Sequence, residues 1–268
     1  MSVSSIENTT ILDLSSNDLT YLPESVCKLT NLETLNLGHN NLTYLPESIG
    51  NLTNLKQLVL SFNELTYLPE SISNLTHLTE LYVSQTKLTR LPDWIGNLTN
   101  LRQLNLSFND LTCLPDTIGN LTNLETLNVW VCKLTSLPES IGNLKNLKVL
   151  AVNNNELTRL PESIGNLTNL EELWLNYNEL TYLPDTIGNL TNLKKLTLIV
   201  NKLTYLPESI DNLANLQILH HDVQEHRGKK LLHILLGHIE ECELPSQKYL
   251  DICNVLSELH QTICKMSI

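Results

Sequence analysis

The sequence predicts an α/β solenoid, in which short coils of chain stack on one another around one continuous core. Two observations carry this prediction. The dipeptide Leu-Pro recurs nine times at an unbroken interval of 23 residues, from Leu22 to Leu206. Each copy follows a Leu-x-Leu or Leu-x-Val segment, an alternation that is typical of a strand with one buried face. Repetition at a period of this length indicates a repeat architecture rather than a compact globule.

One unit, LETLNLGHNNLTYLPESIGNLTN at residues 32–54, defines the elements that each coil is expected to hold. Leu35 and Leu37 face the core from a short strand. Pro46 and the acid after it are typical of the first turn of a helix, and Gly50 is expected to end that turn. Each coil is therefore predicted as a strand, a turn, a short helical or 3-10 segment, and a return.

The spacing LxxLxLxxNxLxxLPxxIxxL resembles the leucine-rich repeat family, in the 23-residue intracellular subclass of Scribble and the Ras-suppressor-type scaffolds. The resemblance implies a horseshoe with a parallel sheet on its concave face and short helical or 3-10 segments on its convex face. We expect an N-terminal extension at 1–8, a solenoid of about nine repeats at 9–219, and a helical C-terminal cap at 220–268.

Composition narrows the class of partner. The formal net charge is −12, so no basic field favours nucleic acid or an anionic membrane. Nine of the 29 acids follow the repeated Pro, where they are expected to complement helix dipoles, although an acid-seeking partner is the alternative. The first residues show no secretory signal, no apolar run is long enough to span a bilayer, and the six Cys form no CxxC pair. We expect a cytoplasmic chain without cofactor or metal.

Aromatic residues gather at the positions that the leucine frame leaves free, on the predicted concave face. Both Phe and two of the three Trp lie there, and exposed aromatics are enriched among interface anchors. Five strand spacings separate the first from the last, about 25 Å, which suits a protein surface or an extended peptide. The predicted partner-binding residues are Phe62, Tyr82, Phe108, Trp130, Val131, Trp174 and Tyr177. The alternative is that these rings only pack on one another across the sheet.

Two columns of equivalent residues change in the middle of the chain. Asn holds the turn after each strand except at Thr86 and Cys132, where a thiol would replace the hydrogen bonds of an amide poorly, at about 1 kcal/mol per bond. Beside Cys132, Trp130 and Val131 form an apolar spot that we expect to be the centre of the binding surface. A Tyr column flanks the sheet as a second contact strip or as drift, at Tyr21, Tyr44, Tyr67, Tyr182 and Tyr205.

The last 49 residues break the period and hold six of the eight His and three of the six Cys. We expect this tail to cap the core of the last repeat. A metal site is disfavoured because His238 and Cys242 stand without a second closely spaced pair of ligands. The predicted N-terminal edge strand, Ile11 to Leu14, has no obvious cap and could pair with another copy.

The chain is therefore predicted to be a non-catalytic protein-interaction module, acting as a scaffold, an adaptor or a host-directed effector in a host cytosol. No GxSxG, GxxxxGK[ST], GxGxxG or HExxH motif is present. The resemblance makes small GTPases or their regulators candidate partners, and the oligomeric state stays open. The alternatives are an enzyme or enzyme-recruiting factor that acts through the tail, and a purely structural spacer.

Overall fold

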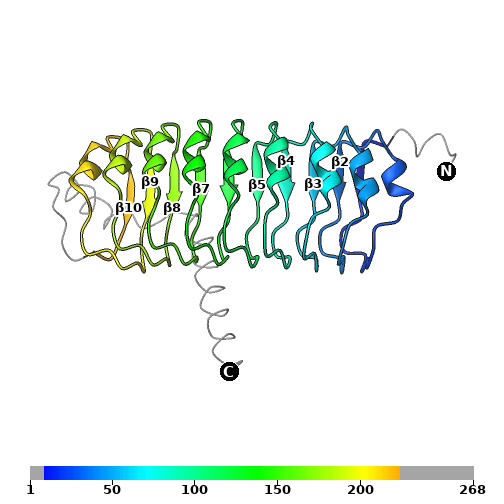
Figure 1. Cartoon of the computed structure of the whole chain (residues 1–268), viewed down its shortest axis with the longest axis horizontal. Helices are drawn as coiled ribbons and strands as arrows, with labels where there is room; N and C mark the ends of the chain where they lie inside the picture. The colour runs from blue at the N-terminus through cyan, green and yellow to red at the C-terminus, as the bar shows by residue number, and fades with distance from the viewer. Residues whose placement is uncertain (1–8, 224–268) are drawn as a thin grey trace, which may run out of the picture.

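The computed structural model describes residues 9–223, which form one stack of coils (Figure 1). Ten strands pair in sequence order, from β1 to β10, into a single parallel sheet. Paired residues in neighbouring strands are always 23 positions apart, as Leu35 is from Leu58, so the strand register follows directly from the length of the repeat. The strands are Ile11–Asp13, Thr34–Asn36, Gln57–Val59, Glu80–Tyr82, Gln103–Asn105, Thr126–Asn128, Val149–Ala151, Glu172–Trp174, Lys195–Thr197 and Ile218–His220. The predicted extension at 1–8 and most of the predicted cap lie outside the described residues.

A 3-10 segment follows each of the first nine strands and forms the second layer of the stack. These segments, η1 to η9, are Val26–Lys28, Glu47–Asn51, Glu70–Asn74, Asp93–Asn97, Asp116–Asn120, Glu139–Asn143, Glu162–Asn166, Asp185–Asn189 and Glu208–Asn212. The sequence predicts Pro46 in the first turn of the segment. In the structure Pro46 lies just before η2, with φ −70° and ψ 149°. Its carbonyl accepts the Ile49 amide at 3.0 Å, so the proline carbonyl starts the segment from an extended residue.

The glycines of the 3-10 segments do not end the helical turn, which corrects the prediction for Gly50. Gly50 lies inside η2 and is buried, and no described glycine has a positive φ. A Cβ on Gly50 would stand 2.5 Å from the Ser71 carbonyl oxygen in the next coil, closer than real atoms approach. Glycine is therefore required at this position by the close contact of neighbouring coils.

Several of the acids after the prolines accept hydrogen bonds from the next coil rather than from their own. The Glu47 carboxylate accepts the Ser71 amide at 3.1 Å, and the Glu139 carboxylate accepts the Ser163 amide at 3.2 Å. Both amides lie in the first turn of the following 3-10 segment, which holds unpaired donors and a partial positive charge. Part of the negative charge of the chain thus links successive coils, and these two carboxylates have a structural partner.

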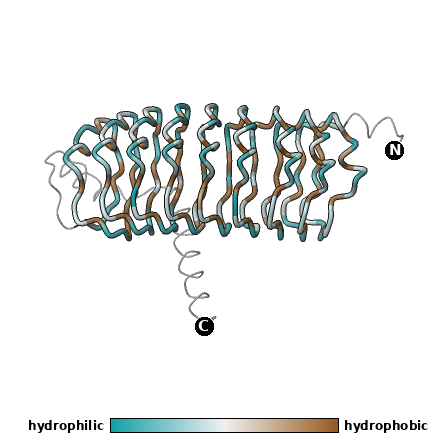
Figure 2. Tube along the Cα trace, in the orientation of Figure 1, coloured by the Kyte–Doolittle hydropathy of each residue, from teal (hydrophilic) through white to brown (hydrophobic). Residues whose placement is uncertain are grey.

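One apolar core runs the length of the stack between the two layers. Leu35, Leu37, Ile49 and Leu52 are completely buried, and the equivalent residues of the other coils repeat this pattern. Figure 2 shows hydrophobic positions recurring at the same places in successive coils. Because each coil buries its side chains against its neighbours, the stability of the stack depends on contacts between coils.

Candidate functional site

The face of the sheet that points away from the core is built from two strand positions in each coil. In β2 the middle residue, Leu35, is buried, while Thr34 and Asn36 on either side are only half-buried. The same pattern recurs in most strands because successive side chains alternate between the two faces. We call this outward face, together with the two loop residues at the third and fourth positions after the buried strand Leu, the sheet face.

The loop at the end of each strand passes through a left-handed backbone conformation. The residue just before the turn position, which holds Asn in all but two coils, has a φ between 51° and 60° in nine coils. We call these positions the left-handed slots: Ser16, His39, Phe62, Gln85, Phe108, Val131, Asn154, Tyr177 and Val200. Glycine and asparagine tolerate this conformation best, whereas it is unusual for bulky and β-branched residues. The slots nevertheless hold two Phe, one Tyr and two Val.

Four of the seven predicted binding residues occupy left-handed slots: Phe62, Phe108, Val131 and Tyr177. Phe62 is 41% exposed, while the other three are half-buried. The repeat pattern predicts these side chains on the outward surface, but it does not predict their backbone conformation. A conformation that disfavours large side chains therefore presents three of the six aromatic residues among the predicted binding residues.

Phe108 and Trp130 form an aromatic pair at the centre of the sheet face. Their ring centroids lie 4.5 Å apart at an interplanar angle of 65°, an edge-to-face contact. The Phe108 amide donates to the Trp130 carbonyl at 2.9 Å, which fixes the two coils in register. Within the described part of the chain, no other two of the predicted residues are in ring contact, so the rings form no continuous ladder. Phe62 instead stacks on His39, with centroids 4.0 Å apart.

Trp174 and Tyr82 lie in strands β8 and β4 and are held by polar neighbours. The Trp174 indole donates to the Glu172 carboxylate at 2.8 Å, and the Lys195 ammonium lies 3.9 Å from the ring centroid, a cation–π contact. Burial lowers the pKa of Lys195, an effect that the Glu172 carboxylate opposes. The Tyr82 hydroxyl contacts Glu80 at 3.0 Å and Gln103 at 2.7 Å.

These contacts orient the two rings and leave them half-buried on the sheet face. Burial, together with a hydrogen bond to Glu80, raises the pKa of Tyr82 to about 12. The phenol is therefore neutral at physiological pH and acts there as a hydrogen-bond donor, not as a base.

The turn column beneath the slots joins each coil to the one before it. The Asn109 side-chain amide donates to the Val83 carbonyl of the preceding coil at 2.7 Å and to Leu106 at 2.8 Å. At Thr86 the hydroxyl bonds forward, to Asn109 at 2.6 Å. Cys132 keeps the backward direction, with its sulfur 3.5 Å from the Leu106 carbonyl oxygen.

Burial raises the pKa of Cys132 to about 11, so the thiol keeps its proton at neutral pH and can donate it. A thiol is a weak donor, as the sequence indicated. It nevertheless reaches the preceding coil, whereas the hydroxyl of Thr86 reaches the following one.

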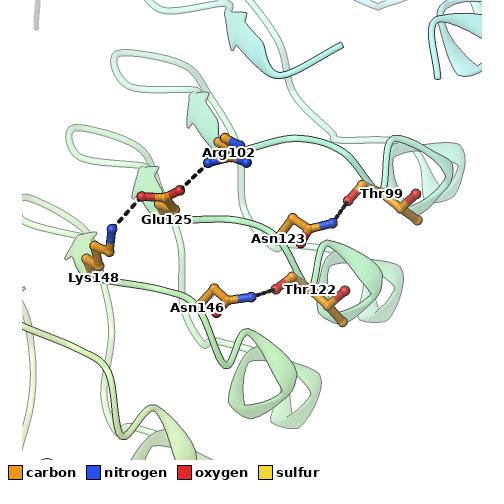
Figure 3. A network of polar contacts seen from close by, with 7 residues as sticks. All are labelled: Thr99, Arg102, Thr122, Asn123, Glu125, Asn146 and Lys148. Atoms are coloured by element: carbon orange, nitrogen blue, oxygen red, sulfur yellow. Dashed lines mark hydrogen bonds and ion pairs between the residues drawn. The ribbon is translucent and has the colours of Figure 1, made fainter. Parts of the chain in front are cut away.

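A groove of about 580 Å³, which none of the sequence-based predictions covers, runs along the rim where the chain enters the strands. Charged residues alternate along it: Glu125 accepts from Arg102 at 3.0 Å and from Lys148 at 2.6 Å (Figure 3). Beside them, Asn123 and Asn146 donate to carbonyls of the preceding coil, at 2.9 and 2.8 Å. The hydrogen bond from Lys148 is the main reason why the pKa of Glu125 lies below its usual value.

Charge read at 23-residue intervals would have found this rim. The residue just before the strand is Arg102, Glu125, Lys148, Glu171 and Lys194 in five successive coils. Cations and acids in that order neutralise one another in neighbouring coils, as the Lys194–Glu171 pair does at 2.6 Å. The groove therefore has no strong net field that would select a charged ligand.

Two further features concern residues 9–223 alone. No group of three His, Cys, Asp or Glu side chains within residues 9–223 is placed to hold a metal ion. Over the same residues, no helix has the length and apolar character needed to cross a bilayer. His238, Cys242 and the rest of the Cys/His-rich tail lie outside the described part.

The Tyr column is exposed, at 57% for Tyr21 and 38% for Tyr182.

The chain belongs to the leucine-rich repeat family. The model of a leucine-rich repeat region matches residues 1–110 and 94–180, in agreement with the ten parallel strands and the 3-10 layer. Comparison with curated protein sequences finds no match.

Similar solved structures are leucine-rich repeat proteins of varied origin. A leucine-rich repeat protein of Leptospira interrogans is 34% identical, with a TM-score of 0.64 over 80% of this chain and 67% of that one. The leucine-rich repeat domain of the type III effector XopL is 29% identical, with a TM-score of 0.73, over 83% and 80%. The Arabidopsis receptor kinase HAESA, in complex with the peptide hormone IDA and the co-receptor SERK1, is 30% identical, with a TM-score of 0.70, over 85% and 40%. The chain thus spans less than half of HAESA.

Proposed function

We propose that this chain is a non-catalytic module that binds a protein partner on its sheet face, as a scaffold, an adaptor or a delivered effector in the cytosol. The fold is one that commonly mediates protein–protein interaction, and HAESA is an example with a peptide hormone and a co-receptor. The binding residues of the proposal are Phe62, Tyr82, Phe108, Trp130, Val131, Trp174 and Tyr177. Small GTPases and their regulators are the first candidates, because the repeats resemble those of Ras-suppressor-type scaffolds.

One observation carries the proposal: bulky side chains occupy the left-handed slots. A left-handed conformation costs an ordinary residue about 1 kcal/mol or more relative to glycine, and strained backbone gathers at functional sites. Packing of the core does not require Phe108 or Val131, since coils with Gln85 and Asn154 in the same slot have the same backbone. The large side chains are retained at a cost to stability, as expected if they contact a partner.

The test replaces the central pair by residues that a neighbouring coil already holds. Asn153 and Asn154 occupy the equivalent positions in the next coil, so Phe108→Asn with Trp130→Asn removes both rings and keeps residues that suit the loop. The matched control, Tyr44→Ser with Tyr67→Ser, removes two rings from the exposed Tyr column and uses the residue found at Ser136. Thermal unfolding checks that all three proteins are folded.

Each protein is used to capture partners from eukaryotic cytosol, and candidate partners are then measured with purified components. A partner that the wild type and the Tyr variant bind, and that the Asn variant binds at least about tenfold more weakly, supports the sheet face. Equal affinity for the Asn variant overturns the proposal. Loss with the Tyr variant alone assigns binding to the Tyr column instead.

A further inference from the structure

The junction between η3 and η4 departs from the way other coils interlock. Elsewhere from η2 onward, a glycine of one 3-10 segment faces a Ser or Thr of the next, as Gly119 faces Ser140 and Gly142 faces Ser163. At this junction Ser73 replaces the glycine, and Trp94 replaces the small hydroxyl residue. It is the one junction within residues 9–223 where both facing positions are enlarged.

The enlarged residues keep η3 and η4 apart. A Cβ at Gly119 or Gly142 would lie 2.5 Å from the facing carbonyl oxygen, and Ser73 carries a real Cβ at the equivalent position. The two segments accordingly touch less than the other consecutive pairs from η2 to η9. The Trp94 side chain is half-buried and packs against the core.

The turn column is also altered at this junction. Asn63 ties the third coil to the second, since its amide donates to the Leu37 carbonyl at 2.9 Å. The equivalent residue of the fourth coil is Thr86, whose hydroxyl bonds forward to Asn109. Three positions that join coils elsewhere are therefore changed together: Ser73, Trp94 and Thr86.

The sheet side of the same junction is held firmly. The Gln57 amide donates to the Glu80 carboxylate at 2.7 Å, the Ser84 hydroxyl donates to Ser61 at 2.9 Å, and Lys87 pairs with Glu64. Strands β3 and β4, side by side in Figure 1, remain hydrogen-bonded along their length. The junction is thus loose at the 3-10 layer and tied at the sheet.

We propose that the Ser73–Trp94 junction is a hinge of the solenoid. The 3-10 layer opens between η3 and η4 while β3 and β4 stay paired, so the block of residues 9–74 turns relative to the block of residues 75–223. Phe62 lies on the first block, and Phe108 and Trp130 lie on the second. The hinge therefore adjusts the shape of the sheet face between them. Opening of the junction does not depend on what the sheet face binds.

Hydrogen exchange of the full chain, followed by mass spectrometry, tests the hinge because it reports local opening. Amides of 70–75 and 93–98 are expected to exchange about tenfold faster than those of 139–144 and 162–167. Amides that join β3 to β4, such as Leu60 and Phe62, which donate to Tyr82 and Ser84, are expected to stay protected. Equal exchange at the two junctions overturns the hinge. Exchange of the β3–β4 amides at the rate of the η3 amides also overturns it, because the whole junction would then unfold.

Two variants exchange the properties of the two junctions. Ser73→Gly with Thr86→Asn and Trp94→Ser introduces residues of the neighbouring coils, and is expected to slow exchange at 70–75 to the rate at 139–144. Gly142→Ser with Asn155→Thr and Ser163→Trp places the three changes between η6 and η7, and is expected to raise exchange there by about the same tenfold. Unchanged exchange in both variants contradicts the assignment of the hinge to these three positions. If either variant does not fold, the comparison of hydrogen exchange at the two junctions of the wild-type chain still tests the hinge.

Discussion

The 3-10 layer and the sheet-face loops use unusual residues for opposite physical reasons. Gly119 has an ordinary backbone conformation, yet a neighbouring coil leaves no room for a side chain. Val131 has a left-handed backbone that favours Gly or Asn, yet it carries a β-branched side chain that is half-exposed. The 3-10 layer lacks side chains at the glycine positions, where neighbouring coils pack closely. The sheet-face loops carry large side chains in a backbone conformation that disfavours them.

This difference separates the residues that pack the coils against one another from the residues that packing does not require and that are therefore available for binding. A single substitution of a buried glycine in the 3-10 layer, such as Gly119, should change stability alone. Substitutions in the left-handed slots should change stability and binding in opposite directions, which is the trade-off found at functional sites. Four predictions test this contrast, from the largest expected effect to the smallest.

Gly119→Ala should destabilise the chain by about 3 kcal/mol, because the new Cβ would lie 2.5 Å from the Ser140 carbonyl oxygen and neither backbone can move freely. An alanine without such a clash would stabilise by about 0.4–1 kcal/mol through the unfolded state. Ser73→Ala is the matched control, since it retains a Cβ already present and should be near neutral. Urea unfolding measures both, and a stabilised Gly119→Ala variant would contradict the packing explanation.

Cys132 should make stability fall in alkaline solution. Burial raises its pKa from 9.0 to about 11 in the folded chain, so the folded state keeps a proton that the unfolded state releases. The contribution of the protonated thiol to the free energy of unfolding is complete below pH 9. It is lost as the pH rises to about 11, at about 1 kcal/mol per pH unit. Urea unfolding at pH 8, 9, 10 and 11 should show a shallower decline for Cys132→Asn than for the wild type. Parallel curves would show that the thiol does not titrate differently in the two states.

Val131→Asn should stabilise the chain by about 1 kcal/mol, because asparagine adopts the left-handed conformation more readily than a β-branched residue. Val200→Asn repeats the test in a slot with φ 56° and 48% exposure. Thermal and urea unfolding give the change in stability, and binding of the captured partner is measured alongside. A loss of stability at both positions would remove the argument that the slots are strained.

Glu125→Gln should have the smallest effect, about 0.5 kcal/mol at low salt, because its ion pairs with Arg102 and Lys148 are solvent-exposed. The difference from wild type should disappear in 1 M salt, where screening acts within about 3 Å. The measurement is urea unfolding at the two ionic strengths. A difference that survives high salt would indicate that the rim contributes through packing or hydrogen bonding instead.

The period of 23 residues was sufficient to predict the leucine frame, and the resemblance to leucine-rich repeats implied the parallel sheet and a layer of short helical or 3-10 segments, of which the structure has the 3-10 form. Each buried apolar position repeats in every coil, as Leu or as a similar apolar residue, so the pattern occurs nine times. The role of Gly50 was predicted wrongly, because a glycine after a helical turn has the same local sequence whether it ends the turn or makes room for Ser71. Only the placement of the next coil distinguishes the two explanations.

The candidate site was predicted less completely. The outward position of Trp174 follows from alternation in a strand, but the left-handed conformation of Phe108 does not, because its residue type favours a different backbone. The ionic rim around Glu125 was overlooked although its signal lies in the sequence, in a column of alternating charge. Reading every column for charge and apolarity would have found it.

The hydrogen bonds between coils also bear on how such a chain can change its length. Asn155 reaches the Val129 carbonyl, 26 residues back, as Asn178 reaches Val152, and each link joins only adjacent coils. A duplication or loss of one complete 23-residue unit therefore gives every amide in the interior an equivalent partner. Insertion of 22 or 24 residues would instead misalign the turn column at that point. Changes of length in whole units therefore preserve the register, so the extent of the sheet face can grow or shrink while the fold stays the same.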